Sequence, residues 1–452
     1  MAKRRILLRT ARVIGSGLLL CLGLLVVSCA TKAEAFKDID KAVHDWEFQK
    51  AADALRTAQE QKKPLYSEKD SILLFLDKGM LEHYARNYAE SAKDLQEAER
   101  LIAEAYTKSV TQEVGSYMVN DNTRDYPGED YEDIYINAFN ALNYYFEENM
   151  EGAMVEIRRM NEKLKALATK YDVELSEVQK KALEDGASEV PPGESTLTKF
   201  NDSALARYLG MLFYRGIGQP DDARIDRDWL LAAMANAPNV YSNPVPKSIS
   251  EELDVPRGMA RLNVIAFSGL SPLKQEEVTR IMLPVGGTQI KITVPIMVRR
   301  PSEVASIKIT VDGKEIAELE LLEDIEAVAI ETFRSRAHLI YTKTVLRATV
   351  KAAVAAASQV AGENVGGNVG LALQVFSLGA KIFNEASEQA DIRISRYFPG
   401  KAYVTGVNLT PGTHSIKILF YNRAGRVIAE TGSFDYDVEE GKLNLIKTAG
   451  LM

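Results

Sequence analysis

The sequence predicts an α+β protein, in which a helical array is followed by a small β-sheet or β-sandwich domain with an inserted helical hairpin. From residue 34 to about residue 240, apolar residues recur at three- and four-residue spacing, which is typical of amphipathic helices. After residue 241 the pattern changes to short apolar or alternating runs between Pro, Gly and Asp-Gly turns, which is typical of strands. We therefore divide the chain into residues 1–28, 29–240 and 241–452.

The first of these segments is predicted to be a signal peptide. Residues 1–12 carry five basic side chains and no acid, and residues 13–27 are apolar except for Gly and Ser. A helix needs about 20 apolar residues to cross a bilayer. The stretch is short for a membrane span and fits an export signal, so we expect the body of the protein to leave the cytoplasm.

Cys29 is the candidate lipidation site. The residues Val26-Val27-Ser28-Cys29 resemble the lipobox of bacterial lipoproteins, which implies a diacylglyceryl group on the thiol and cleavage before Cys29. Two or more acyl chains anchor a protein stably, whereas one chain is marginal. No aspartate follows Cys29, so the same resemblance implies the outer membrane, with the body facing the periplasm. Cleavage after Ala30 to a soluble product and an uncleaved anchor are the alternatives.

Charge and cysteine usage exclude several classes of function. The formal net charge is −8, and loss of the five basic residues of the signal peptide takes it to −13. An acidic body repels phosphate backbones, which argues against nucleic-acid binding. Neither cysteine lies beyond residue 29, so the body holds no disulfide, thiolate metal site or catalytic cysteine. The histidines lack metal-binding spacing, and we expect neither metal nor cofactor.

A shared residue pattern predicts repeated helix pairs in the N-terminal half. The pattern is a large residue, a small one three positions later and a large one four positions after that. On a helix these positions form one face, and the small residue permits a close neighbour. Gly79, in the helix before the second occurrence, is expected to pack against such a face. The occurrences are Phe48-x-x-Ala51-x-x-x-Leu55, Tyr88-x-x-Ser91-x-x-x-Leu95, Met150-x-x-Ala153-x-x-x-Ile157 and, more weakly, Pro220-x-x-Ala223.

These segments resemble tetratricopeptide repeats, which are helix–turn–helix units of about 34 residues. Longer and irregular spacing indicates a degenerate array, with insertions at 121–130 and 185–198; a plain helical bundle is the alternative. A stacked array implies a groove that accepts a peptide or protein. Asparagines three residues apart could clamp a peptide backbone there, or could instead satisfy a nearby loop. The candidate partner-binding residues are Asn137, Asn140, Asn143 and Tyr144.

The C-terminal half reads as strands around a helical insertion. Residues 324–390 are helical and alanine-rich, and we expect a helical hairpin packed on the sheet. The pair Asp312-Gly313 supplies the positive φ angles of a two-residue hairpin turn. Pro295 within its run suggests an edge strand. The predicted strands are Leu262–Phe267, Gln289–Arg299, Ser306–Val311, Lys314–Leu321, Lys401–Leu409, His414–Tyr421 and Val427–Thr431.

Two blocks of the sequence resemble a family of uncharacterised bacterial lipoproteins with tetratricopeptide-like repeats. The first block is Ile136-Asn137-x-Phe139 with Val155-Glu156-Ile157-Arg158. The second is Ala390-Asp391-x-Arg393, then Phe398-Pro399 and Leu409-x-Pro411-Gly412. The resemblance implies an envelope protein of a kind often encoded near outer-membrane lipoproteins that activate peptidoglycan synthases, which is a hint about its partners.

Catalytic motifs are missing from the sequence, which holds no G-x-S-x-G elbow, P-loop or dinucleotide fingerprint. Acidic residues gather at Glu147, Glu148 and Glu151 and again at 129–133, and paired carboxylates could cleave glycosidic bonds. We expect both groups to be solvated faces. The sequence therefore predicts a non-enzymatic, membrane-anchored scaffold that binds an envelope protein or peptide. The alternative is a cell-wall enzyme or a polysaccharide-binding accessory protein.

Overall fold

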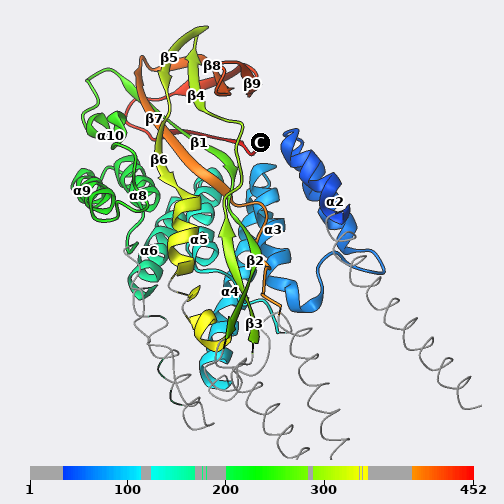
Figure 1. The fold of residues 1–452 in the computed structure, drawn as a ribbon. Coiled ribbons are helices and arrows are strands. Elements are labelled where there is room, and N and C mark those ends of the chain that lie inside the picture. Colours follow the sequence, from blue (N-terminus) through cyan, green and yellow to red (C-terminus); the bar gives the residue numbers. More distant parts are fainter. Residues whose placement is uncertain are drawn as a thin grey trace, which may run out of the picture.

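A computed structural model describes residues 34–112, 124–167, 200–282, 289–344 without 335 and 338, and 389–452, together with residues 170, 176 and 180. Helices occupy the N-terminal half of the chain and sheets the C-terminal half, as predicted (Figure 1). The predicted signal peptide, Cys29 and most of the predicted helical insertion lie outside the described residues. Of that insertion, the structure describes a helix that follows residue 324.

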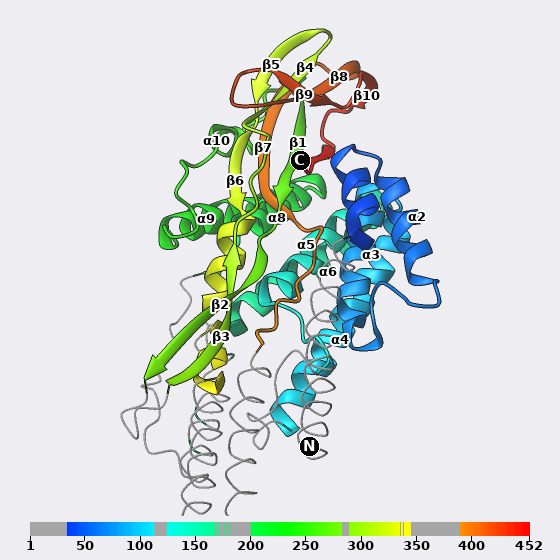
Figure 2. The same cartoon turned by 45° about the vertical axis from the view of Figure 1, so that its right-hand side comes forward.

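The helices form a sequential array in which each packs on the next along the chain (Figures 1 and 2). A helical stretch at 34–44 precedes them, and a short helix, α10 (Lys247–Glu251), follows. None of the described helices is long and apolar enough to cross a membrane. The helices of the array are α2 (Phe48–Gln59), α3 (Ser71–Tyr84), α4 (Tyr88–Gln112), α5 (Asp130–Phe146), α6 (Met150–Leu167), α8 (Ala204–Gly216) and α9 (Pro220–Asn236).

Four turns between paired helices share one backbone geometry. In each, one residue adopts a positive φ of 59° to 74°, and the next helix begins two residues later. The amide between them donates to the carbonyl five residues earlier, at 2.8 to 2.9 Å. This is the Schellman pattern, which satisfies the free carbonyls of a helix end. The four residues with positive φ are Trp46, Arg86, Glu148 and Gly218.

The small residues predicted from the sequence pattern occupy equivalent positions after these turns. Ala51, Ser91, Ala153 and Ala223 each bond through the backbone to the residue before the new helix, and all four are fully buried. Gly79 packs as expected, because an added Cβ would lie 2.7 Å from the Leu95 side chain. Each hairpin therefore brings its two helices together at the same place.

The strands form two stacked sheets and a separate hairpin. The central sheet has the order β11-β1-β7-β6. Strand β11 (Asn444–Gly450) is parallel to β1 (Ala260–Leu270). Strand β7 (Pro399–Leu409) is antiparallel to β1, and β6 (Glu320–Asp324) is antiparallel to β7. The hairpin pairs β2 with β3. The remaining strands are β2 (Leu273–Met282), β3 (Gln289–Val298), β4 (Ser306–Val311), β5 (Lys314–Glu318), β8 (Gly412–Tyr421), β9 (Val427–Glu430) and β10 (Phe434–Val438).

The second sheet contains the hairpin that the sequence predicted most directly. Its order is β10-β8-β4-β5, and β9 also pairs with β8. Asp312 and Gly313 adopt φ of 52° and 79°, which confirms the predicted two-residue turn between β4 and β5. The predicted strand at 314–321 is divided, because β5 ends at Glu318 and β6 begins in the other sheet. Strands β2, β10 and β11 were not predicted from the sequence.

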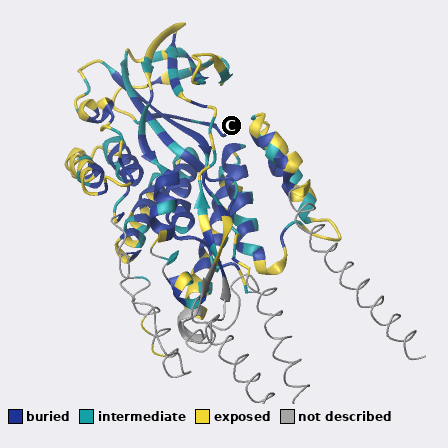
Figure 3. Ribbon diagram, in the orientation of Figure 1, coloured by how far each residue is buried: buried dark blue, intermediate teal, exposed yellow. Residues whose placement is uncertain are grey.

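The central sheet is the middle layer of three. Leu262, Val264 and Ala266 of β1 pack against the second sheet, whereas Ile265 and Phe267 belong to the core shared with the helices. Strand β1 is therefore buried on both faces, whereas β7 and β6 of the same sheet include partly exposed residues (Figure 3). One hydrophobic core extends from the helices into the sheet, so residue 240 marks a change of secondary structure within that core.

Candidate functional site

The three predicted asparagines lie in the interior, where Asn137 and Asn143 bond to side chains of other helices. Asn137, Asn140 and Asn143 of α5 are fully buried. The Asn137 amide donates to Glu99 of α4 at 3.0 Å and to Glu156 of α6 at 2.6 Å. No partner can reach these amides in the folded chain, because polar side chains at α-helical spacing face the neighbouring helices rather than a groove. This corrects their predicted contact with a peptide.

Tyr144 is the remaining candidate partner-binding residue, and it lies at the surface. Its ring is partly exposed and its hydroxyl bonds to the side chain of Gln96 on α4. The adjoining Tyr145 and Phe146 pack inward, where Tyr145 stacks on Phe213 and Phe146 stacks on Tyr88. Binding of a partner at Tyr144 stays a prediction.

The inner face of the helical array is covered by the chain's own sheet. The helices α3, α5 and α8, each the first of its hairpin, contact the central sheet: Phe139 of α5 lies 5.1 Å from Phe267, and Asn263 donates to the hydroxyl of Tyr208 on α8. His83 at the end of α3 contacts Lys447 of β11. The surface where a repeat array would hold a peptide is thus occupied, and Figure 2 shows α9, the second helix of its hairpin, farther from β1 than α8.

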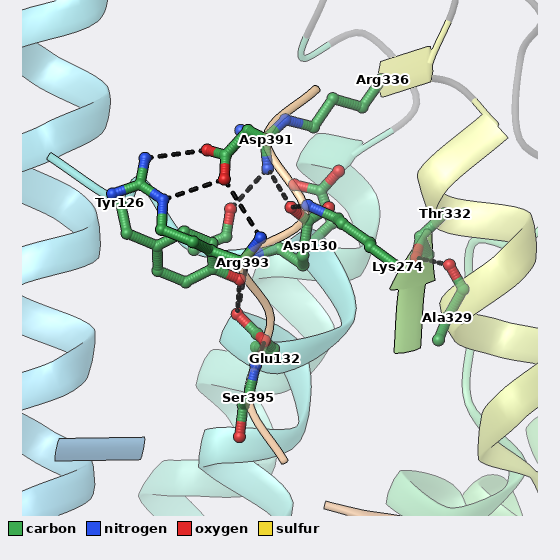
Figure 4. Close-up of polar contacts among 12 residues, drawn as sticks. Tyr126, Asp130, Glu132, Lys274, Ala329, Thr332, Arg336, Asp391, Arg393 and Ser395 are labelled. Atoms are coloured by element: carbon green, nitrogen blue, oxygen red, sulfur yellow. Dashed lines mark hydrogen bonds and ion pairs between the residues drawn. The ribbon is translucent and has the colours of Figure 1, made fainter. Parts of the chain in front are cut away.

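An extended segment, residues 389–398, runs along the helices and is termed the strap here. Two buried carboxyl groups accept hydrogen bonds from its backbone. The N–H of Ser395 donates to Glu132 of α5 at 2.7 Å, and the N–H of Arg396 donates to Asp77 of α3 at 2.7 Å. The strap contains part of the second block of the family resemblance, and Figure 4 shows Ser395 beside Glu132.

Arginines of the strap add charged contacts on either side of Ser395. Arg393 pairs with Asp391 at 2.8 Å and with Asp70 at 3.1 Å. Arg396 pairs with Asp40 at 2.6 Å. These contacts join the strap to the N-terminal helices, more than 300 residues earlier in the chain. The strap therefore fastens the first helix pairs to the sheet that follows it.

A second group of charged residues lies at the start of the strap. Lys274 of β2 and Glu129 form an ion pair in which both side chains are almost fully buried. Arg336, on the helix after β6, donates to the same Glu129 carboxylate at 2.8 Å. We define the collar as Glu129, Lys274, Arg336, Asp391 and Arg393, of which Figure 4 labels all but Glu129. It joins the start of α5, the base of the β2–β3 hairpin, the helix after β6 and the strap.

Glu132 is a fully buried carboxyl group whose pKa is raised. Burial and the neighbouring Glu129 raise its pKa from 4.5 to about 7, against the hydrogen bonds that it accepts. Donors to it include the Glu129 N–H and the Tyr126 hydroxyl, both at 2.8 Å. The acidic group at 129–133 was expected to be solvated, and that expectation is wrong. Glu129 and Glu132 form a capping box at the start of α5. The Glu129 carboxylate is also paired with Lys274 and Arg336, which come from distant segments of the chain.

The other acidic group remains at the surface. Glu147, Glu148 and Glu151 are exposed at the α5–α6 turn and the start of α6. Nearby lies a cavity of about 440 Å³ between this turn and the β10–β11 connection. Its walls include Tyr145, Phe146 and Tyr436. Within the described part of the chain, no group of three or more histidines or acids could hold a metal ion.

Comparisons with known proteins add no identification. No family model matches the chain, and neither a curated protein nor a solved structure matches it. The fold and the collar therefore define the class only as a mixed protein of helix pairs packed on a two-sheet sandwich.

Proposed function

We propose that the chain is a lipid-anchored, non-enzymatic scaffold that binds a protein or peptide in the bacterial envelope. In this proposal Cys29 carries the lipid, and the body faces the periplasm from the outer membrane. The lipobox-like sequence supports the anchor, and the helical array supports the scaffold. No catalytic group, cofactor or metal takes part.

The four identical turns are the observation that carries the scaffold proposal. A plain bundle has no reason to repeat a positive-φ residue, a captured amide and a small buried residue at the same offsets in four hairpins. Repetition of one unit is the property of tetratricopeptide-like arrays, whose curved surfaces serve protein binding. We therefore propose that the array is of this type, with irregular segments between its units.

Partner binding is proposed on the outer helices, because the sheet covers the inner ones. Helix α9, the last described helix of the array, exposes Ile225 and Trp229 to 47% and 53%. Large exposed aromatic side chains are the usual anchors of protein interfaces. Tyr144 and Gln96 offer a second patch between α4 and α5. The exposed Glu147 and Glu151 give no specific support to the alternative of a cell-wall enzyme.

The proposal is tested by photo-crosslinking in the native envelope. A benzoylphenylalanine is placed at Trp229 or Tyr144, and a matched control is placed at Ile316 of β5, which is 41% exposed. We expect a discrete protein adduct from one of the array positions and none from Ile316. Cys29→Ser should release the protein from membranes, or accumulate its precursor, and weaken the adduct. Absence of any adduct from both array positions would contradict the scaffold.

A further inference from the structure

The cavity between the α5–α6 turn and the β10–β11 connection has an apolar interior and a charged mouth. Its volume of about 440 Å³ lies near the lower end of the range for small-molecule sites. Leu445 is buried and forms part of its floor, and the rings of Phe146 and Tyr436 form part of its wall. Glu148 and Lys442 also line it, and because both are exposed they lie at its open side. A small molecule with an apolar body and a charged end would fit this arrangement.

The two charged groups at the mouth have opposite sign. Among the described residues that line the cavity, Lys442 is the only base and Glu148 is the only acid. Lys442 is paired with Glu439 at 2.6 Å, but the two side chains are 66% and 50% exposed. Exposed ion pairs contribute little to stability. The Lys442 ammonium can therefore exchange Glu439 for the carboxylate of a ligand at small cost.

Glu148 keeps a carboxylate at the mouth although the backbone there favours glycine. Its φ is 59°, and the equivalent turn between α8 and α9 has Gly218, which adopts such an angle without strain. The Glu148 side chain forms no hydrogen bond or ion pair with the other residues that the structure describes. Backbone strain of this kind is typical of ligand-binding sites, where a particular side chain is needed. The carboxylate is thus free to pair with a cationic group of a ligand.

We propose that this cavity binds a free aromatic amino acid. Its ammonium group pairs with Glu148, its carboxylate pairs with Lys442, and its ring lies against Phe146 and Tyr436. Aromatic rings pack favourably on one another, which selects a ring over a small side chain. A residue within a peptide lacks both terminal charges, so the two groups at the mouth select the free amino acid. The site needs neither the lipid anchor nor the partner-binding surfaces and goes beyond the proposed scaffold.

The test is calorimetric titration of the whole protein with phenylalanine and three related compounds. N-acetylphenylalanine lacks the ammonium group, phenylalaninamide lacks the carboxylate, and alanine lacks the ring. Loss of one hydrogen-bonded charge weakens binding by about tenfold. We therefore expect phenylalanine to bind about tenfold more tightly than either blocked compound, and alanine to bind more weakly than phenylalanine. Equal affinities for phenylalanine and the two blocked compounds, or no saturable binding of phenylalanine, would overturn the proposal.

Two variants assign the charges to the site. Glu148→Gln should weaken binding of phenylalanine and phenylalaninamide but not of N-acetylphenylalanine. Lys442→Met should weaken binding of phenylalanine and N-acetylphenylalanine but not of phenylalaninamide.

The matched controls leave the cavity unchanged. They are Glu151→Gln, in the same exposed acidic group, and Lys50→Met, whose ion pair with Glu47 at 2.6 Å has the same spacing and similar exposure as that of Lys442. Circular dichroism checks that each variant is folded, and if one is not, the four compounds on the unaltered protein decide the matter. Equal losses in the controls, or losses that do not depend on which end of the ligand is blocked, would show that the cavity does not bind an amino acid in this way.

Discussion

Single buried carboxyl groups organise much of the polar interior. Glu323 of β6 accepts hydrogen bonds from the hydroxyls of Tyr135, Tyr241 and Ser203, at 2.5 to 2.9 Å, and so connects the central sheet to α5 and α8. Glu132 plays the same part for the strap. A buried acceptor with several donors is stable in place, because the loss of any partner leaves a polar atom unsatisfied.

The pKa of Glu132 predicts how stability depends on pH. Folding raises this pKa from 4.5 to about 7, so the folded chain holds the proton more tightly than the unfolded chain. Its contribution to stability is therefore complete below pH 4.5 and is lost as the pH rises through about 7. Glu132→Gln removes this contribution, which is at most about 3 kcal/mol, and keeps an acceptor for Ser395.

The measurement is urea unfolding at pH 4.5, 6 and 8 for the unaltered protein, for Glu132→Gln and for the exposed control Glu151→Gln. We expect the free energy of unfolding of Glu132→Gln to decline less over this range. A pH profile identical in all three proteins would show that Glu132 does not titrate as stated.

The conformation of single residues could be predicted from the sequence where neighbouring residues determine it. The Asp312-Gly313 turn needs only two neighbouring backbone angles, and the pattern revealed it. The burial of Glu129 could not be predicted, because its cations come from positions 145 and 207 residues later. The burial of Asn137 and Asn143 could not be predicted for the same reason, since their bonding partners lie on α3, α4 and α6.

Among the helices and strands, the turns of the array show what sequence patterns can and cannot reveal. The small residues Ala51, Ser91 and Ala153 identified the hairpins correctly. The turns themselves gave little signal, because Trp46, Arg86 and Glu148 adopt a conformation that usually favours glycine. Strand β11 was not predicted either, because a short parallel edge strand depends on partners elsewhere in the chain.

Replacement of Glu148 by glycine is expected to stabilise the α5–α6 hairpin. The residue is exposed and has φ of 59°, a conformation that costs a non-glycine residue about 1 kcal/mol. Glu148→Gly should raise the free energy of unfolding by up to about 1 kcal/mol. Glu151→Gly, three residues later inside α6, should lower it by about the same amount. Chemical denaturation measures both, and equal signs would exclude backbone strain at Glu148.

Two hydrophobic cores that share β1 hold the molecule together, one between the helices and the central sheet and one between the two sheets. The strap, the collar and β1 each contact both halves. We therefore expect a single cooperative unfolding transition. In Trp229→Phe, the remaining Trp46 lies 4.9 Å from Phe420 of the second sheet and reports the contact between the first hairpin and that sheet. Its fluorescence and the helical circular dichroism should change at the same denaturant concentration, whereas two separate midpoints would contradict the coupling of the two cores through β1.

The parallel pairing of β1 with β11 also has a consequence for synthesis. Strand β1 is made at residues 260–270, but its two neighbours are made only at 399–409 and 444–450. Long-range pairing of this kind is slow and cannot begin before the later strand exists. A ribosome-bound chain therefore keeps its central layer open until very late in translation. Under the proposal that the chain is exported through a translocation channel, this delay would preserve the extended state that passage requires.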